Sequence, residues 1–262
     1  MIRNFLNLFI LIRVNLLNYR YYFINSFFDL ISYPGYLIIY YFVWKGILNN
    51  SESYTSLRDI MIYFSIALFV YSLYNDRIIN EMVEDCVVKG ELTKYLCKPI
   101  TLIESIFGKV FCNVIIKMPF LLLLLIYLKY LQFKIQLFQI IQFLIIINLS
   151  IIINTLFYFL ISLLSFKFER VWVLRMLISN VVSFFSGSII PLYIFPEKIL
   201  KIINILPFKF FVFVPTTYLQ NKLYLDSFIK DIFIEIVWLI IFAISSLLAW
   251  QKALKVYSGY GV

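Results

Sequence analysis

The sequence predicts an all-α integral membrane protein with one transmembrane domain over residues 1–262. Hydrophobic residues make up 63% of the chain and charged residues only 14%, whereas a soluble domain carries about 25% charged residues. Several apolar runs also reach the roughly 20 residues that a helix needs to cross a bilayer. Lipid is therefore a better solvent for this chain than water.

Residues 1–20 predict an amphipathic helix that lies in the membrane interface. Asn4, Asn7, Asn15 and Asn18 fall in one narrow sector when residues are placed about 100° apart, and most of the remaining surface is Leu, Ile and Phe. Such a helix buries its apolar side at the boundary between headgroups and acyl chains. The alternative is that this segment begins the first span.

Six apolar segments predict six transmembrane helices. The first ends at Trp44 and Lys45, a pair that anchors helices at the interface. The third contains Pro119, which neighbouring helices can accommodate. The predicted spans are residues 21–48, 59–80, 103–131, 135–166, 171–190 and 228–250.

Four prolines interrupt residues 191–218, a segment that we call the outer hairpin. They are Pro191, Pro196, Pro207 and Pro215, and the apolar pieces between them are too short to cross a bilayer. We expect an extracellular re-entrant helical hairpin between spans 5 and 6, because interrupted backbone at membrane depth must be buried in protein.

The basic residues predict the orientation. Six spans place both termini on the same side. With the termini in the cytoplasm, six of the seven Arg residues flank the inner ends of the spans, as the positive-inside rule expects. The net charge of +9 then indicates contact with anionic lipid headgroups rather than with nucleic acid.

The sequence carries no pattern for chemistry of its own. It has no His, and Gly108-Lys109 lacks the preceding glycine of a phosphate-binding loop. We expect no bound metal or other cofactor. The acidic cluster of Glu81, Glu84 and Asp85 is expected to be a solvated helix face. The three cysteines have no C-x-x-C spacing and are expected to be reduced thiols near the cytoplasm.

Polar and small residues inside the predicted spans are expected to serve helix packing. Asn148, Ser150 and Asn154 lie in the fourth span and are expected to hydrogen-bond to neighbouring helices. Gly187 lies among serines at the end of the fifth span and should allow close helix approach. Asp29, near the start of the first span, is either a transport residue or a hydrated group close to the interface.

Residues 81–100, the coupling segment, are unusually charged for this chain. A helix should continue to about Val88 and end at Gly90, since glycine readily adopts the positive φ of a helix C-cap. A second short helix should then place Leu92, Tyr95 and Leu96 on one side. This patch would fit a groove on a cytoplasmic partner. The alternative is a connector that rests on the membrane.

The order Gly90-Glu91-Leu92, Tyr95-Leu96 and Lys98-Pro99 resembles the G-x-L…L-x-x-P segment of ATP-binding-cassette (ABC) transporter permeases of the type-2 exporter class. More narrowly, the chain resembles a six-span family of similar length. The stretches "FKFFVFVPTTYL" and "WQKALKVYSGYGV" are similar to the family's approach to its last span and to its closing pattern. Cys97-Lys98 departs from the Leu-Arg pair that the family commonly has.

The resemblance implies a permease subunit without catalytic residues of its own, which exports a substrate across the cytoplasmic membrane of a bacterium. Separate ABC ATPase subunits would bind ATP and magnesium, and a second permease, identical or related, would complete the complex. The ATPase-coupling residues would be Glu84, Asp85, Gly90, Glu91, Leu92, Tyr95, Leu96, Lys98 and Pro99.

Two other functions are open at this point. A stand-alone secondary carrier would show an internal repeat or paired ionisable groups at mid-membrane. A membrane scaffold that recruits a cytoplasmic protein would share the docking helix, but its complex would show no substrate-stimulated ATP hydrolysis.

Overall fold

The computed structural model describes residues 2–18, 23–49, 56–97, 100–168, 171–221 and 225–256, and every element in these ranges is helical. The predicted all-α class is confirmed. The long and medium helices are α1 (Ile2–Asn18), α2 (Phe23–Asn49), α3 (Leu57–Leu73), α4 (Asp76–Val88), α6 (Leu102–Tyr130), α7 (Leu137–Ser162), α8 (Trp172–Ser186), α9 (Glu197–Ile205) and α11 (Leu225–Val256). The short ones are α5 (Leu92–Leu96), α10 (Phe213–Leu219) and the 3-10 turns η2 (Leu163–Phe166), η3 (Leu192–Ile194) and η4 (Pro207–Phe210).

Among the described residues, four helices are long and apolar enough to cross a membrane. They are Leu57–Val87, Leu102–Tyr130, Leu137–Phe166 and Ser227–Lys255. A fifth candidate is the pair Glu197–Ile205 and Pro207–Leu219, which is bent by 83° and forms either a broken span or a re-entrant loop. The chain is thus a multi-pass membrane protein with four to five long apolar helical segments.

The two remaining predicted spans, the first and the fifth, are not among these four. Helix α2 has 27 residues and is about 40 Å long, which is long enough to cross a bilayer, and it contains Pro34. Helix α8 has only 15 residues, or about 22 Å, which is less than the roughly 30 Å of a bilayer core. It ends at Gly187, whose φ of 86° is left-handed and stops the helix before the predicted boundary at residue 190.

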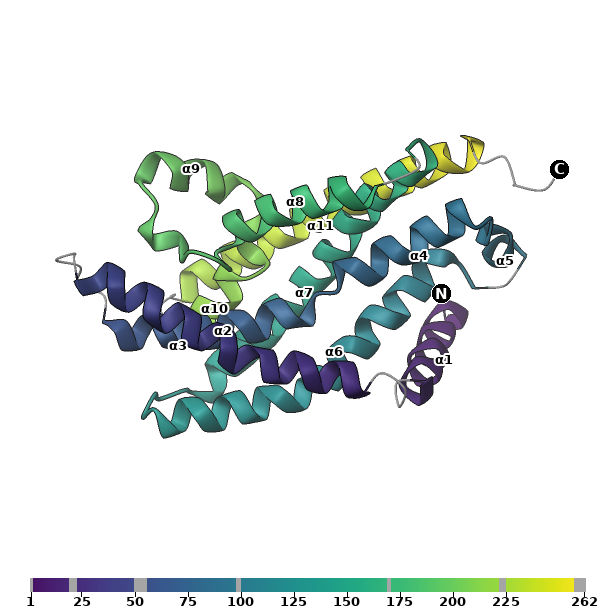
Figure 1. Ribbon diagram of the computed structural model, residues 1–262. Helices are drawn as coiled ribbons and strands as arrows, with labels where there is room; N and C mark the ends of the chain where they lie inside the picture. The colour runs from purple at the N-terminus through teal and green to yellow at the C-terminus, as the bar shows by residue number, and fades with distance from the viewer. Residues whose placement is uncertain are drawn as a thin grey trace.

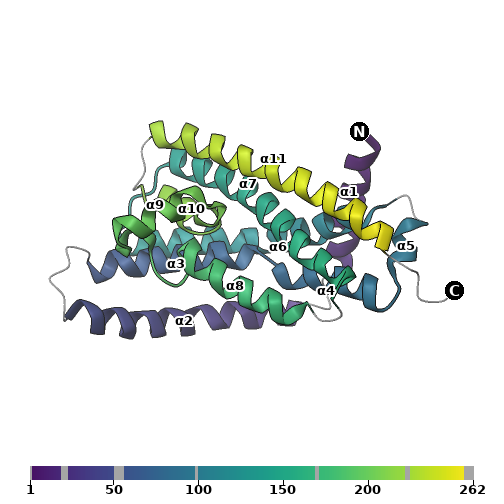
Figure 2. The same cartoon turned by 90° about the horizontal axis from the view of Figure 1, so that it is seen from above.

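The bundle has two distinct ends. Helix α5, helix α1 and the C-terminal end of α11 lie at one end, whereas α9 and the turn between α6 and α7 lie at the other (Figure 1, Figure 2). Helix α1 lies against α6 at Gly108, where an added Cβ would come within 2.9 Å of Leu11 Cβ. The glycine thus lets α1 approach the bundle closely.

The predicted second span is broken at Tyr74 and Asn75, in the middle of the bundle. The Asn75 side chain accepts a hydrogen bond from the Ile78 backbone N–H and so caps α4, as Asn commonly does. The freed backbone carbonyls of α3 accept hydrogen bonds from α6. Lys117 Nζ lies 2.8 Å from the Ser72 oxygen, and Asn113 Nδ2 lies 3.1 Å from the Leu73 oxygen. These two carbonyls at the break therefore have donors from α6.

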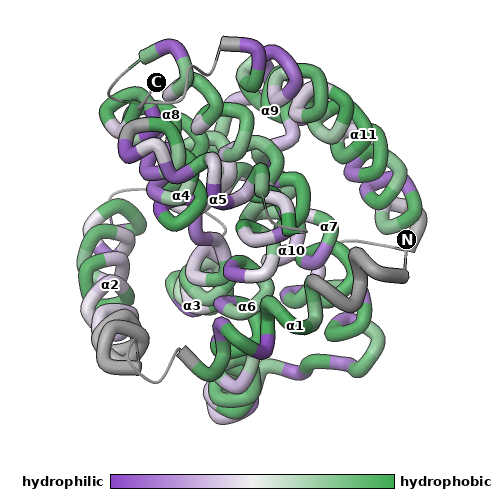
Figure 3. The backbone as a smooth tube through the Cα atoms, turned by 90° about the vertical axis from the view of Figure 1, so that its right-hand side faces the viewer, coloured by the Kyte–Doolittle hydropathy of each residue, from purple (hydrophilic) through white to green (hydrophobic). Residues whose placement is uncertain are grey.

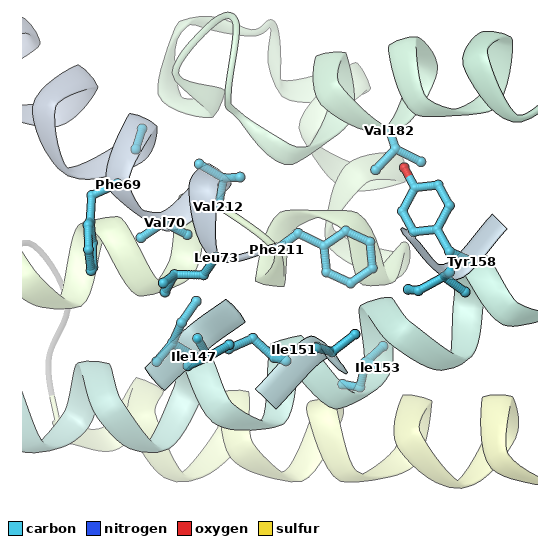
Figure 4. Close-up of a cluster of buried hydrophobic side chains, with 14 of the residues drawn as sticks. Phe69, Val70, Leu73, Ile147, Ile151, Ile153, Tyr158, Val182, Phe211 and Val212 are labelled. Atoms are coloured by element: carbon cyan, nitrogen blue, oxygen red, sulfur yellow. The ribbon is translucent and has the colours of Figure 1, made fainter. Parts of the chain in front are cut away.

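The second half of the outer hairpin enters the protein interior. Phe210, Phe211 and the residues of α10 are mostly buried, and α10 packs on α7 and α3. Leu73, Phe211 and Val212 gather over Ile147 and Ile151 of α7 (Figure 4). The interrupted backbone of this segment is therefore buried in protein, as a re-entrant hairpin requires.

Candidate functional site

The end of α4, the turn at Gly90 and α5 make up the coupling segment, which lies at the end of the bundle that carries α5 (Figure 2). We call this pair of helices with its turn the corner. Helix α4 carries a run of hydrophilic residues, whereas α7 and α11 are mostly hydrophobic (Figure 3). Helix α4 ends at Lys89, and Gly90 follows with a φ of 68°. The predicted glycine turn is confirmed, and its positive φ costs a glycine little.

The three predicted apolar contacts of α5 do not form one exposed patch. Leu92 is completely buried and belongs to the main core cluster. Tyr95 is half-buried, and this burial raises the pKa of its hydroxyl. Leu96 is 55% exposed. Leu92 therefore holds α5 on the bundle, and Leu96 is the apolar side chain that a partner can reach. Lys98 and Pro99 lie outside the described residues.

Ion pairs cover the solvent side of the segment. Asp85 lies 2.9 Å from Lys89, and Glu91 lies 2.8 Å from Lys94. The hydrogen bond from Lys89 to Asp85 raises the pKa of the Lys89 ammonium group. All four side chains are at least 40% exposed, so each pair adds little to stability. The pairs instead give the corner a surface of both charges, next to the apolar Leu96.

Glu84 has a role that the sequence reasoning missed. We expected a solvated helix face, but Glu84 Oε1 accepts a hydrogen bond of 3.1 Å from the backbone N–H of Val171, the N-cap of α8. A carboxylate at a helix N-terminus satisfies a free N–H and complements the helix dipole. Glu84 therefore attaches α4 to the start of α8.

A second link joins the same two helices. Arg175 Nη1 of α8 lies 2.8 Å from Asp76 Oδ2 of α4, and both side chains are less than 25% exposed. Partial burial makes this pair stronger than the exposed ones, because water screens it less. A charged side chain such as Arg175 inside an apolar helix is itself a signal of a specific partner in the sequence.

A small cavity of about 40 Å³ lies between these helices and the bundle core. Its lining is mixed: the polar side chains include Asp76, Asn154 and Ser179, and the apolar ones include Val182 and Phe211. The volume suits one water molecule or two rather than a transported substrate.

The fold and this corner define the class: a multi-pass α-helical membrane protein with a charged, capped helix pair at one end. Residues 22–261 match the family described as ABC-2 family transporter protein. The match covers most of the chain, and the chain belongs to this family of transporter membrane components, which are typically non-catalytic permease subunits. The comparison with curated proteins found no match.

Proposed function

We propose that this chain is the permease subunit of an ABC exporter, which moves a substrate outward with ATP hydrolysed by separate ATPase subunits. In this proposal the α5 end of the bundle faces the cytoplasm, and α2 and α8 complete a six-pass topology. A second permease, identical or related, forms the other half of the transport path. The family membership supports the proposal, since ABC-2 membrane components generally work with an ATPase partner.

The observation that carries the proposal is the position of α4. This helix leads directly to the exposed side of α5, and it also holds α8 through Asp76 and Glu84. The two contacts lie eight residues apart, or about 12 Å along the helix. A push on α5 by an ATPase would therefore reach α8 through one continuous helix, α4.

A substitution at Leu96 tests the docking step. Leu96→Asp places a charge on an exposed position, so we expect the fold to persist and the co-purification of the ATPase to fall by at least about tenfold, a loss of roughly 1.4 kcal/mol. Leu92→Ala removes a buried side chain and should instead destabilise the protein by about 2–5 kcal/mol.

The matched control is Ile205→Asp, which makes the same kind of change at an exposed position of α9 at the opposite end. It should leave ATPase binding intact. If Leu96→Asp and Ile205→Asp retain the ATPase equally well, docking at α5 is wrong.

A further inference from the structure

Glu235 of α11 is a carboxyl group that is completely buried in the bundle. Its Oε1 lies 2.6 Å from the hydroxyl of Ser150 on α7. Its Oε2 is buried and has no hydrogen-bond partner within the described residues. An ionised carboxylate that is fully buried with a single hydrogen bond from the protein is very unfavourable.

The hydrogen bonds around Ser150 determine where the proton is. Ser150 Oγ lies 2.6 Å from Glu235 Oε1 and also 2.7 Å from the backbone oxygen of Phe210. A serine hydroxyl has one proton to donate, and a carbonyl oxygen has none. Both short contacts are hydrogen bonds only if Glu235 supplies the second proton. Glu235 then donates to Ser150, and Ser150 donates to the Phe210 carbonyl.

The charged neighbours agree with a neutral Glu235. Asp231, one turn earlier on α11, is the charged group that acts on Glu235 within the described residues. Asp231 accepts a hydrogen bond of 2.8 Å from the Tyr218 hydroxyl of α10, and Lys209 of η4 and Lys230 of α11 act on it as cations. Two buried like charges one turn apart repel each other, so the deeper acid takes up the proton.

The same residues hold the interrupted backbone of the outer hairpin. The chain is not helical at residues 211 and 212, between η4 and α10. Here the carbonyl of Phe210, the last residue of η4, accepts from Ser150, and the Phe211 carbonyl accepts from the Tyr74 hydroxyl. Tyr74 itself lies at the break between α3 and α4. Glu235 is thus the end of a hydrogen-bond chain that ties α11 through α7 to the hairpin.

We propose that Glu235 is a proton-binding site, and that the bound proton fastens the outer hairpin to α7 and α11. Loss of the proton leaves a carboxylate that can only accept. Ser150 then donates to Glu235, and the Phe210 carbonyl loses its donor, which releases η4 and α10 from α7. The ligand is the proton alone, and the proposal does not depend on ATPase docking at α5.

Infrared difference spectroscopy of the purified full chain in lipid nanodiscs tests the protonation. The spectrum of wild type minus Glu235→Gln at neutral pH should show the C=O stretch of a protonated carboxylic acid, and wild type minus the control Asp231→Asn should not. Ser150→Ala should shift the Glu235 band to higher frequency, because the acid loses its acceptor. Absence of the band in wild type, or its persistence in Glu235→Gln, overturns the proposal. Should Glu235→Gln fail to fold, the comparison with Ser150→Ala decides alone.

Thiol labelling tests whether the proton on Glu235 holds the hairpin on α7 and α11. Val214 of α10 is only 3% exposed, and Val214→Cys is placed in a chain whose three native cysteines are replaced by alanine. At alkaline pH the labelling should be about tenfold faster with Glu235 than with Glu235→Gln at the same pH, as expected for the loss of one hydrogen bond to a buried group. Equal rates at every pH would contradict the fastening role.

Discussion

At the residue scale, Gly187 shows how one backbone position fixes the packing of three elements. Its φ of 86° ends α8, and its carbonyl accepts a hydrogen bond of 2.6 Å from the Tyr63 hydroxyl of α3. An added Cβ would lie 2.7 Å from that hydroxyl oxygen and 3.1 Å from Phe213 Cβ of α10. The expected close approach at Gly187 is confirmed, and it joins α8, α3 and α10.

Gly187→Ala should therefore destabilise the protein. The left-handed backbone costs an alanine about 1–2 kcal/mol, and the contact with Tyr63 adds to this cost. The thermal unfolding midpoint in detergent is the measurement. Gly46→Ala is the control, since an added Cβ there meets nothing within 4 Å and alanine is the better helix former. A midpoint of Gly187→Ala equal to that of Gly46→Ala would contradict the argument.

At the element scale, helices α3 and α4 act as two pieces of one membrane segment. The break between them is satisfied by side chains from α6, as Asn113 and Lys117 cover the Leu73 and Ser72 carbonyls. A cation also suits the negative end of the α3 dipole. This arrangement gives the Ser72 and Leu73 carbonyls donors within the bundle.

Asn113→Leu tests this support. It leaves the buried Leu73 carbonyl without its side-chain donor, which should cost about 1–3 kcal/mol of unfolding free energy. The matched control is Asn148→Leu on α7, because Asn148 is exposed and bonds only to the Leu144 carbonyl of its own helix within the described residues. Unfolding in a mixed-micelle denaturant series should separate the two variants, and equal stabilities would show that the α3–α4 break needs no donor from α6.

The link between α4 and α8 is the second element-scale feature. Glu84→Leu removes the acceptor of the Val171 N–H and leaves the Asp76–Arg175 pair as the remaining link, so ATP should move α8 less although the ATPase still binds. A cysteine at the exposed Met176 of α8, with Cys97 replaced by serine, reports the movement as an ATP-dependent labelling rate.

Glu81→Leu is the matched control for this link. Glu81 pairs only with Arg77 of its own helix in the described part of the chain and is more than half exposed. We expect the full ATP-dependent change in rate with Glu81→Leu and a smaller change with Glu84→Leu, in which the Asp76–Arg175 pair remains. An unchanged ATP response in Glu84→Leu would mean that α8 is moved by another route.

At the scale of the whole molecule, the two ends of the bundle differ in a way that fits a membrane crossing. One end presents α5 with its ion pairs, and the other presents α9, whose Ile202 and Ile205 are more than 60% exposed. Between them the outer surfaces of α6, α8 and α11 are covered with exposed Leu, Ile, Val and Phe. Such a surface suits lipid rather than water.

The proposed orientation predicts which thiols an impermeant reagent reaches. Native Cys97 is exposed at the α5 end, whereas Cys86 and Cys112 are buried. A cysteine at Ile205 lies at the opposite end of the bundle (Figure 1). Intact cells should be labelled at Ile205→Cys and not at Cys97, and inside-out vesicles should show the reverse. Labelling of both positions from one side would contradict the orientation.

Much of the fold is predictable from the sequence because lipid imposes a local rule. An apolar run of sufficient length must be a helix, since its backbone groups have no other partners. The starts of α6 and α7, the glycine turn at Gly90 and the proline-interrupted hairpin all follow from such local patterns. Even the break in the second span lies where its apolar run ends, at Tyr74.

The hydrogen-bond partner of each polar side chain was not predictable, because it depends on contacts between residues far apart in the chain. Ser150 does bond to another element, as expected, whereas Asn148 bonds to its own helix. Asp231 and Glu235 lie in an apolar run and could have been singled out as intramembrane carboxylates, but their different partners belong to α10 and α7.

The sequence by itself determined a charged, glycine-capped corner between membrane helices, because glycine, proline and charge act locally. The tertiary structure alone decided that Leu92 is buried in the core whereas Leu96 is exposed, and that Glu84 binds the start of α8. It also decided that Ser150 contacts both Glu235 and the Phe210 carbonyl. The reason is physical. Burial and hydrogen-bond satisfaction are properties of the packed bundle, and a residue's own neighbours in the chain do not fix them.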